Sequence, residues 1–279
     1  MKTIKALCGL LVTGAMMTGC SNEDNVESTN TPKGGKTYYL SVNASKGSDD
    51  NSTRALALDD KTLKATWATT EHVYVQGTLL ADNSKFWFNG TIRPQYPGTS
   101  TLLSGAISLP DIYEISIDDA IGDPHKLDLQ FPRPGELDYT GQVGTLADIA
   151  AKYDYAIANG VRFDIEDDHI EGVGEADFIN QQAIVKFTLI DKADETVKLS
   201  PTALTVEYGE NSVSLTNIPA TTYTTNGDGV LFVAIPGFES QTVKLTAVAG
   251  GNIYTYSKES VTFVNGKYYE IKVKMKSLN

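Results

Sequence analysis

Apolar and polar side chains alternate along much of this chain, and the first clear example is residues 38–43. Tyr38, Leu40 and Val42 occupy every second position there, which places them on one face of an extended strand. Similar short segments recur between turn residues at 62–66, 72–76, 85–88, 100–104, 114–117 and 126–130, and later at 183–190, 203–208, 212–216, 230–235, 242–249, 253–256 and 268–275. This spacing predicts an all-β protein built from β-sandwich domains.

One short helix is expected among these strands. Thr145 can cap it, and Leu146, Ile149, Ala150 and Tyr153 would share one face. Because the helix is short, we expect it to cover the end of a sheet.

The chain is expected to divide near Gly172, where an acidic stretch ends in glycines. Residues 37–172 would form the first β-sandwich domain and residues 173–279 the second. The later segments number about seven strands in about a hundred residues, which is the count of a Greek-key sandwich.

The first residues have the pattern of an export signal. Lys2 and Lys5 precede an apolar run over residues 6–17, and Met17-Thr18-Gly19-Cys20 follows. That ending resembles a bacterial lipobox, in which the preceding peptide is removed and the cysteine is acylated. We therefore predict a signal peptide at 1–19, a fatty acid such as palmitate on Cys20, and a polar tether at 20–36. Ordinary secretion with cleavage nearby is the alternative.

The composition argues against some classes of function. The formal net charge is −12 at pH 7, and loss of Lys2 and Lys5 with the signal makes the mature chain more acidic. This charge argues against binding to nucleic acid and against electrostatic attachment to anionic lipid. Cys8 lies in the signal and Cys20 would carry lipid, so the fold must depend on its hydrophobic cores and not on a disulfide.

Candidate catalytic and metal-binding residues are few. The chain has no GxSxG motif, no P-loop and no GxGxxG after a strand, and its histidines form no HxH or HExxH pair. One acidic loop could hold calcium, but its spacing is more typical of a solvated linker; it contains Asp164, Glu166, Asp167, Asp168 and Glu171. The sequence thus predicts no enzyme activity, no metal site and no cofactor.

Arg54 is the first arginine of the chain and lies in a polar break over residues 46–54. A protease can bind an extended segment in an exposed polar loop, so Arg54 is a candidate cleavage site. The alternative is a solvated arginine without such a role.

The order of these features resembles the fimbrillin family of Bacteroidetes, the subunits of their type V pili. The resemblance rests on the lipobox, the first strand, and several further segments: Thr53-Arg54-Ala55, Trp67 ahead of Val73-Tyr74-Val75, Tyr153-Asp154-Tyr155, residues 183–189 and residues 265–273. It implies two β-sandwich domains, the first transthyretin-like, and no catalysis.

The resemblance also implies an assembly route. A lipidated precursor would be cut after Arg54, the first strand with Tyr38, Leu40 and Val42 would leave, and a neighbour's C-terminal strand would fill the groove. Loss of a strand exposes unpaired backbone groups above an apolar trough, which is a strong template for strand addition.

The last strand, 268–275, fits two roles. Tyr269, Ile271, Val273 and Met275 form one apolar face, so the segment could be donated to a neighbouring subunit. It could also be the closing strand of its own domain, and the sequence favours that interpretation because no separate donor segment is evident after it.

The first function predicted is a structural or adhesive subunit of a cell-surface pilus. The precursor would be anchored in the outer membrane, and its partners would be other pilus subunits and, if it is adhesive, a host or bacterial surface ligand. The alternative is a surface glycan-binding lipoprotein of an uptake system. Exposure of Trp67 and Trp87 in an aromatic row would favour the alternative, whereas their burial in a core would favour the pilus subunit.

Overall fold

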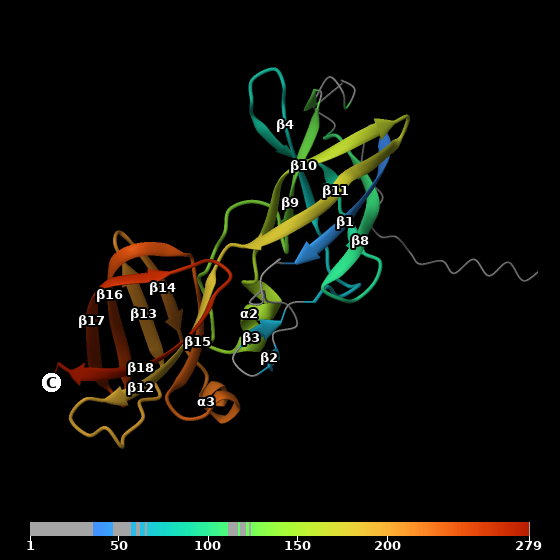
Figure 1. The fold of residues 1–279 in the computed structure, drawn as a ribbon. Helices are drawn as coiled ribbons and strands as arrows, with labels where there is room; N and C mark the ends of the chain where they lie inside the picture. Colours follow the sequence, from blue (N-terminus) through green and yellow to red (C-terminus); the bar gives the residue numbers. More distant parts are fainter. Residues whose placement is uncertain are drawn as a thin grey trace, which may run out of the picture.

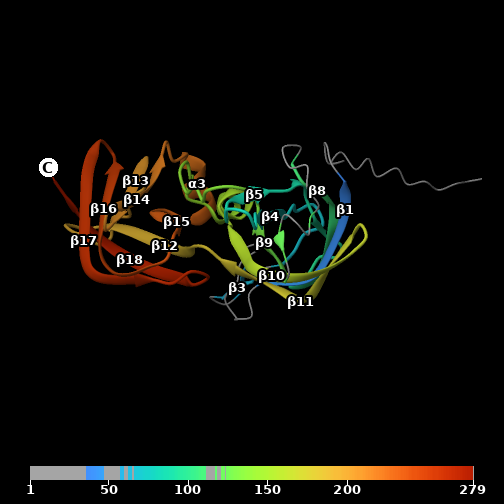
Figure 2. The ribbon, with the colours of Figure 1, turned by 90° about the horizontal axis from the view of Figure 1, so that it is seen from above.

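The computed structural model describes residues 36–46, 66–110, 117, 121, 122 and 124–278, together with the backbone of residues 57–59 and 62–64. The described chain forms two large sheets, which lie one after the other along the long axis of the molecule (Figure 1, Figure 2). Cys20, Arg54, the predicted signal peptide and nearly all of the tether lie outside the described residues.

The first sheet has the strand order β5-β4-β9-β10-β11-β1-β8-β6, and β7 pairs with β8 beside that path. Its strands are β1 (Thr37–Lys46), β4 (Tyr74–Thr78), β5 (Lys85–Trp87), β6 (Asn89–Gly90), β7 (Arg93–Pro94), β8 (Ser100–Ser108), β9 (His125–Phe131), β10 (Ala156–Glu166) and β11 (His169–Asn180). Two short strands, β2 (Ala57–Asp59) and β3 (Thr62–Lys64), form a separate two-stranded sheet.

The second sheet has the order β14-β13-β16-β17-β18-β12-β15. Its strands are β12 (Ala183–Asp191), β13 (Ala203–Tyr208), β14 (Asn211–Thr216), β15 (Val230–Ile235), β16 (Phe238–Ala249), β17 (Asn252–Phe263) and β18 (Tyr268–Ser277). All seven later segments predicted from the sequence are therefore strands, although β16 and β17 each extend well beyond their predicted ends.

Within each sheet, the strand that comes first in the chain pairs in parallel with the strand that comes last, and this pair lies inside the strand order. β1 pairs in parallel with β11, and β12 pairs in parallel with β18. The two sheets form nearly closed, sandwich- or barrel-like units, which confirms the all-β fold class. Alternation along a strand identifies its buried face but not its partner, so the sequence did not predict these parallel pairs.

The predicted boundary at Gly172 does not coincide with the change of sheet. β11 continues through Gly172 to Asn180 and pairs with β1 and β10 on both sides of that residue. The chain passes to the second sheet only at Gln181 and Gln182, between β11 and β12. The acidic stretch that ends near Gly172, interpreted above as a linker, belongs to the β10–β11 hairpin of the first sheet.

The predicted helix is present as α2 (Leu146–Lys152). The Thr145 hydroxyl accepts a hydrogen bond from the Asp148 backbone N–H at 3.2 Å, as expected of an N-cap. Ile149 is fully buried, and it belongs to the hydrophobic core of the second unit. The helix precedes β10 in the chain but packs in the later core.

A second helix, α3 (Ala220–Asn226), was not predicted because its threonine-rich sequence has low helix propensity. Of the strand predicted at 114–117, only Ile117 is described; it is buried and has helical backbone, so the strand prediction is wrong at that residue. Within the described ranges, no helix combines the length and the apolar character needed to cross a membrane.

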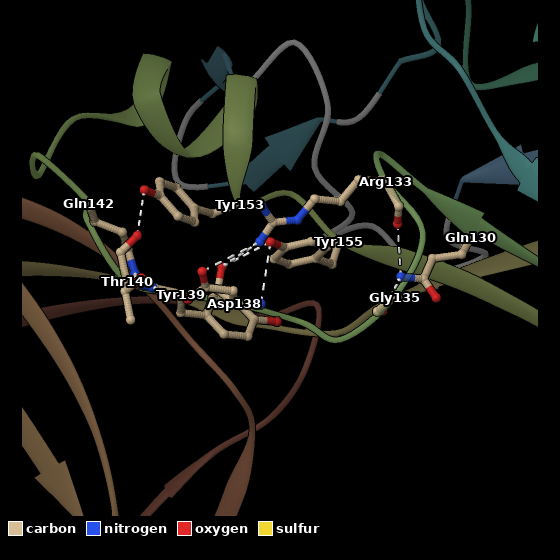
Figure 3. Close-up of polar contacts among 9 residues, drawn as sticks. All are labelled: Gln130, Arg133, Gly135, Asp138, Tyr139, Thr140, Gln142, Tyr153 and Tyr155. Carbon is tan, nitrogen blue, oxygen red and sulfur yellow. Dashed lines mark hydrogen bonds and ion pairs between the residues drawn. The ribbon is translucent and has the colours of Figure 1, made fainter.

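A junction segment, residues 132–155, is held by hydrogen bonds among its own residues (Figure 3) and by others to the crossover and the second sheet. The Tyr155 hydroxyl donates to the Asp138 carbonyl at 2.9 Å, and the Tyr153 hydroxyl donates to the Thr140 carbonyl at 2.7 Å. The Tyr139 hydroxyl donates to the Gln181 carbonyl at 3.0 Å, at the point where the chain changes sheets. The segment is therefore fixed to the crossover as well as to the second core.

Candidate assembly site at the first strand

β1 lies inside the first sheet and not at its edge. It pairs antiparallel with β8 from Thr37–Ser108 to Ser45–Ser100, and in parallel with β11 from Tyr39–His169 to Lys46–Phe178. Both of its backbone edges are therefore hydrogen-bonded, and its removal would leave two unpaired edges facing one slot.

The inner face of β1 is apolar and fully covered. Tyr38, Leu40, Val42 and Ala44 are 3%, 1%, 2% and 0% exposed. The predicted burial of Tyr38, Leu40 and Val42 is confirmed. Burial of such side chains stabilises by about 1.5–3 kcal/mol each for the larger ones, so β1 contributes several kcal/mol to the first unit before its ordering entropy is subtracted.

Gly172 has a packing role beneath β1. A Cβ atom at Gly172 would lie 2.3 Å from Cγ2 and 2.7 Å from Cβ of Val42, which is closer than real contacts allow. The register between β1 and β11 shifts at this point, between Ser41 and Asn43. The glycine thus lets β11 approach the side chain of β1, and this explains a residue that sequence reasoning assigned to a linker.

The C-terminal end of β1 carries a buried lysine. The Lys46 Nζ atom lies 2.9 Å from Oε2 of Glu71 and donates to the Thr66 carbonyl at 3.2 Å. The same atom lies 3.7 Å from the centre of the Trp67 ring, within cation–π range. Only 3% of the Lys46 side chain and 18% of the Glu71 side chain are exposed.

Sequence reasoning missed this arrangement because it placed Lys46 at the start of the polar break. One signal was available: Lys46 continues the alternation of Leu40, Val42 and Ala44, so it falls on the buried face of the strand. An electrostatic contact therefore fixes the end of β1, in addition to its apolar packing.

The two tryptophans differ in their surroundings. Trp67 is 1% exposed, and its ring packs edge-on against Phe178 at 5.1 Å and Phe131 at 6.1 Å, which confirms its predicted burial. Trp87 is only partly buried, because the neighbouring Phe86 and Phe88 take the inward positions of that segment. Full core burial was therefore wrong for Trp87.

An aromatic row of the kind expected for glycan binding is not present in the described part of the chain. Tyr39 and Tyr96 are its only large aromatic side chains above one-third exposure, at 53% and 64%. Tyr39 lies on β1 and contacts the His169 ring at 5.8 Å, whereas Tyr96 lies between β7 and β8.

The candidate donor strand is β18, and it is built into the second sheet. It pairs with β12 from Ile184–Tyr268 to Asp191–Met275, and with β17 at its far end. Val273 and Met275 are 1% and 0% exposed, while Tyr269 and Ile271 are partly buried against the same core. The four residues predicted to share a face therefore pack into their own unit.

The acidic loop is the end of the β10–β11 hairpin. Asp164 lies opposite Glu171 and Glu166 lies opposite His169 in the antiparallel register. No group of three acidic, histidine or cysteine side chains in the described residues is arranged to hold a metal ion.

His72 lies away from this hairpin. Its Nδ1 atom forms a 3.0 Å hydrogen bond with the Thr91 hydroxyl. Burial, together with the nearby charge of Arg93, lowers the pKa of His72.

Comparison with known proteins gives only distant similarities. No family model matches the chain, and no curated protein matches its sequence. A fimbrial protein from Bacteroides ovatus is 14% identical with a TM-score of 0.36; the alignment covers 88% of this chain and 49% of that one, so this chain spans about half its length.

Two further solved structures match over most of their length. A fimbrial assembly protein from Parabacteroides distasonis is 12% identical with a TM-score of 0.39, covering 85% of this chain and 90% of that chain. The tip fimbrial protein Mfa3 from Porphyromonas gingivalis is 9% identical with a TM-score of 0.35, covering 86% and 95%. The names of these three proteins describe them as fimbrial. At such TM-scores the alignments carry no argument, and the function is argued below from the chain's own residues.

Proposed function

We propose that this chain is a structural or adhesive subunit of a cell-surface pilus, and that its first strand is a replaceable part of the first unit. The observation that carries the proposal is the position of β1: it lies between β8 and β11 and buries Tyr38, Leu40 and Val42. It is also the first strand of the described chain, so a single cut on its C-terminal side separates it covalently from the rest.

The proposed route begins with export as a lipoprotein anchored through Cys20 in the outer membrane. Cleavage after Arg54 then separates β1 from the chain that follows. The arginine lies between Lys46, the last residue of β1, and Ala57, the first residue of β2, so the cut falls in a connection between strands.

The freed strand then leaves, and an extended strand of a neighbouring subunit takes its place. The incoming strand would pair with β8 and β11 and cover the trough formed by residues such as Leu103, Ile107 and Ile170, all 0% exposed. Strand addition of this kind obtains affinity from main-chain hydrogen bonds and specificity from alternate side chains.

The geometry of β18 supports an accepting role for this chain. Donation of β18 would remove Val273 and Met275 from the second core and leave β12 without its parallel partner. We therefore propose that β18 closes its own unit. The strand donated to this chain then comes from a subunit of another kind.

The test uses the exported chain carrying Cys20→Ala, so that it is soluble, and limited digestion with trypsin. Mass spectrometry should detect early cutting after Arg54 while β1 stays bound, because its buried face and two hydrogen-bonded edges hold it in place. A fluorescent peptide with the sequence of residues 37–46 should then exchange into the nicked protein and raise its polarisation.

The matched control carries Arg54→Ala, which should bind no peptide under the same conditions because the covalent β1 fills the slot. Absence of exchange into a chain that is demonstrably nicked after Arg54 would contradict the proposal. So would recovery of surface filaments whose subunits still begin at Cys20.

A further inference from the structure

The outer face of the second sheet carries a basic hollow, which is unexpected in a chain with a net charge of −12. Five lysines line this hollow, which has a volume of about 660 Å³, and we call it the lysine hollow: Lys192, Lys244, Lys272, Lys274 and Lys276. Among the residues that the structure describes, Glu207 is the one acidic residue in its lining.

The strand geometry of β18 gathers three of these lysines. Val273 and Met275 point into the core, so Lys272, Lys274 and Lys276 project together from the other face. Lys274 forms an ion pair with Glu195. Among the residues that the structure describes, Lys272 and Lys276 have no ion pair, so their positive charges remain available to a partner.

An acidic counterpart lies at the end of the β10–β11 hairpin. Asp164, Glu166, Asp167, His169 and Glu171 line a hollow of about 360 Å³ there, and we call this the acidic hairpin end. Asp164 and Glu171 are direct cross-strand neighbours. Like charges placed opposite each other destabilise a hairpin, so a cationic partner would relieve a cost that the isolated chain bears.

The two surfaces lie at opposite ends of the molecule. The turn between β10 and β11 lies at the far end of the first unit, whereas β18 begins beside the crossover and runs to the C-terminus at the far end of the second (Figure 1, Figure 2). One chain cannot bring them together, but two chains in line can. A contact between unlike surfaces leaves both outer ends free, so it can repeat in an open series.

We propose that the acidic hairpin end of one copy docks into the lysine hollow of a second copy, so that the chains associate head to tail through charge. This inference goes beyond the proposed function, because it requires neither cleavage nor strand exchange. Since opposite surface charges act mainly through long-range attraction, the contact would raise the rate at which copies meet in this orientation.

The test measures self-association of the full exported chain carrying Cys20→Ala and Arg54→Ala, which can be neither lipidated at Cys20 nor cut after Arg54. Sedimentation velocity at about 30 mM NaCl should show species that grow with protein concentration, and about 500 mM NaCl should dissociate them because the Debye length becomes short. Lys272→Glu with Lys276→Glu should weaken association about tenfold or more, and so should Asp164→Lys with Glu171→Lys.

The decisive measurement mixes the protein carrying Lys272→Glu and Lys276→Glu with the protein carrying Asp164→Lys and Glu171→Lys. Each alone keeps one charged end while its substituted end becomes about neutral, so each should stay monomeric. The mixture combines the unchanged acidic hairpin end of one protein with the unchanged lysine hollow of the other, so it should form pairs. Lys126→Glu with Lys258→Glu is the matched control, since both lysines are exposed but lie outside the hollow, and it should associate like the parent.

A parent chain that remains monomeric at low salt would overturn the inference. The inference would also be overturned if either doubly substituted protein associated like the parent, or if their mixture stayed monomeric. None of these outcomes bears on strand exchange, which is tested separately with the nicked protein.

Discussion

Lys46 and Glu71 form an ion pair that holds the end of β1 inside the first unit, with 2.9 Å between Nζ and Oε2. The ring of Trp67 lies beneath the same ammonium group. One partner belongs to the strand proposed to leave and the other to the part that stays. A single substitution that removes this pair should therefore weaken the hold of the first unit on β1.

Glu71→Gln is expected to lower the free energy of unfolding by about 2–4 kcal/mol, because it leaves the buried Lys46 charge without its carboxylate. Urea titration measures the change. Lys85→Met is the control, since Lys85 is 54% exposed and its pair with Asp128 should contribute less than about 1 kcal/mol. Equal effects of the two substitutions would contradict the role given to the buried pair.

Gly172→Ala is expected to destabilise the first unit by about 1–3 kcal/mol, because the new methyl group meets Val42. In a chain that also carries Val42→Ala, the added cost of Gly172→Ala should shrink, since the nearest colliding atom, Cγ2 of Val42, is gone and only Cβ at 2.7 Å remains. Strict additivity of the two changes would show that the contact between β1 and β11 does not constrain Gly172.

Gln142→Leu is expected to destabilise the second unit by about 2–4 kcal/mol. The Gln142 amide accepts from the Ala234 N–H and donates to the Ala234 carbonyl, both at 2.8 Å, and so completes the hydrogen bonding of β15. Hydrogen exchange at the Ala234 amide should accelerate. Gln95→Leu, at an exposed hydrogen bond, should change stability by no more than about 0.5 kcal/mol.

A fragment of residues 173–279 is expected to lack a cooperative unfolding transition. Tyr139, Ile149 and Tyr155 contribute to the second core but precede this fragment in the chain. A fragment of residues 132–279 restores them and should melt cooperatively. Cooperative melting of the shorter fragment, followed by circular dichroism, would contradict this assignment of the core.

Alkaline pH is expected to destabilise the protein through its buried tyrosines. Burial, assisted by Tyr155, raises the pKa of Tyr139 well above its ordinary value of 10.0. The folded state therefore keeps the proton while the unfolded state loses it, so the stabilisation is complete below pH 10 and declines as the pH rises above it. Between pH 8 and pH 11 the Tm of Tyr139→Phe should fall less steeply than that of the parent, and equal slopes would contradict this contribution.

The sequence predicted the elements better than their connections. Alternation identified β1 and its buried residues Tyr38, Leu40 and Val42, and it located every strand of the second sheet. It failed in the β10–β11 hairpin, because the charged residues at the hairpin end hide the strand pattern and Gly172 looks like a linker residue. The need for that glycine comes from Val42, which is 130 residues away and cannot be seen in a local window.

The candidate assembly site at β1 was only partly predictable. The apolar face of β1 follows from the alternation of apolar and polar residues along the strand, but the Lys46–Glu71 pair depends on a tertiary contact. The packing of Tyr139 and Ile149 in the later core likewise depends on how the junction segment folds back, which no periodicity along the chain encodes.

The placement of β1 between an antiparallel and a parallel neighbour has a mechanical consequence. If a neighbour's strand takes this position, a pull along the filament acts along the strand and loads the hydrogen bonds of both ladders in shear. Those bonds must then yield together, whereas a strand peeled from a sheet edge loses them one at a time. A joint of this kind would resist tension from flow or from an attached cell without any covalent link between subunits.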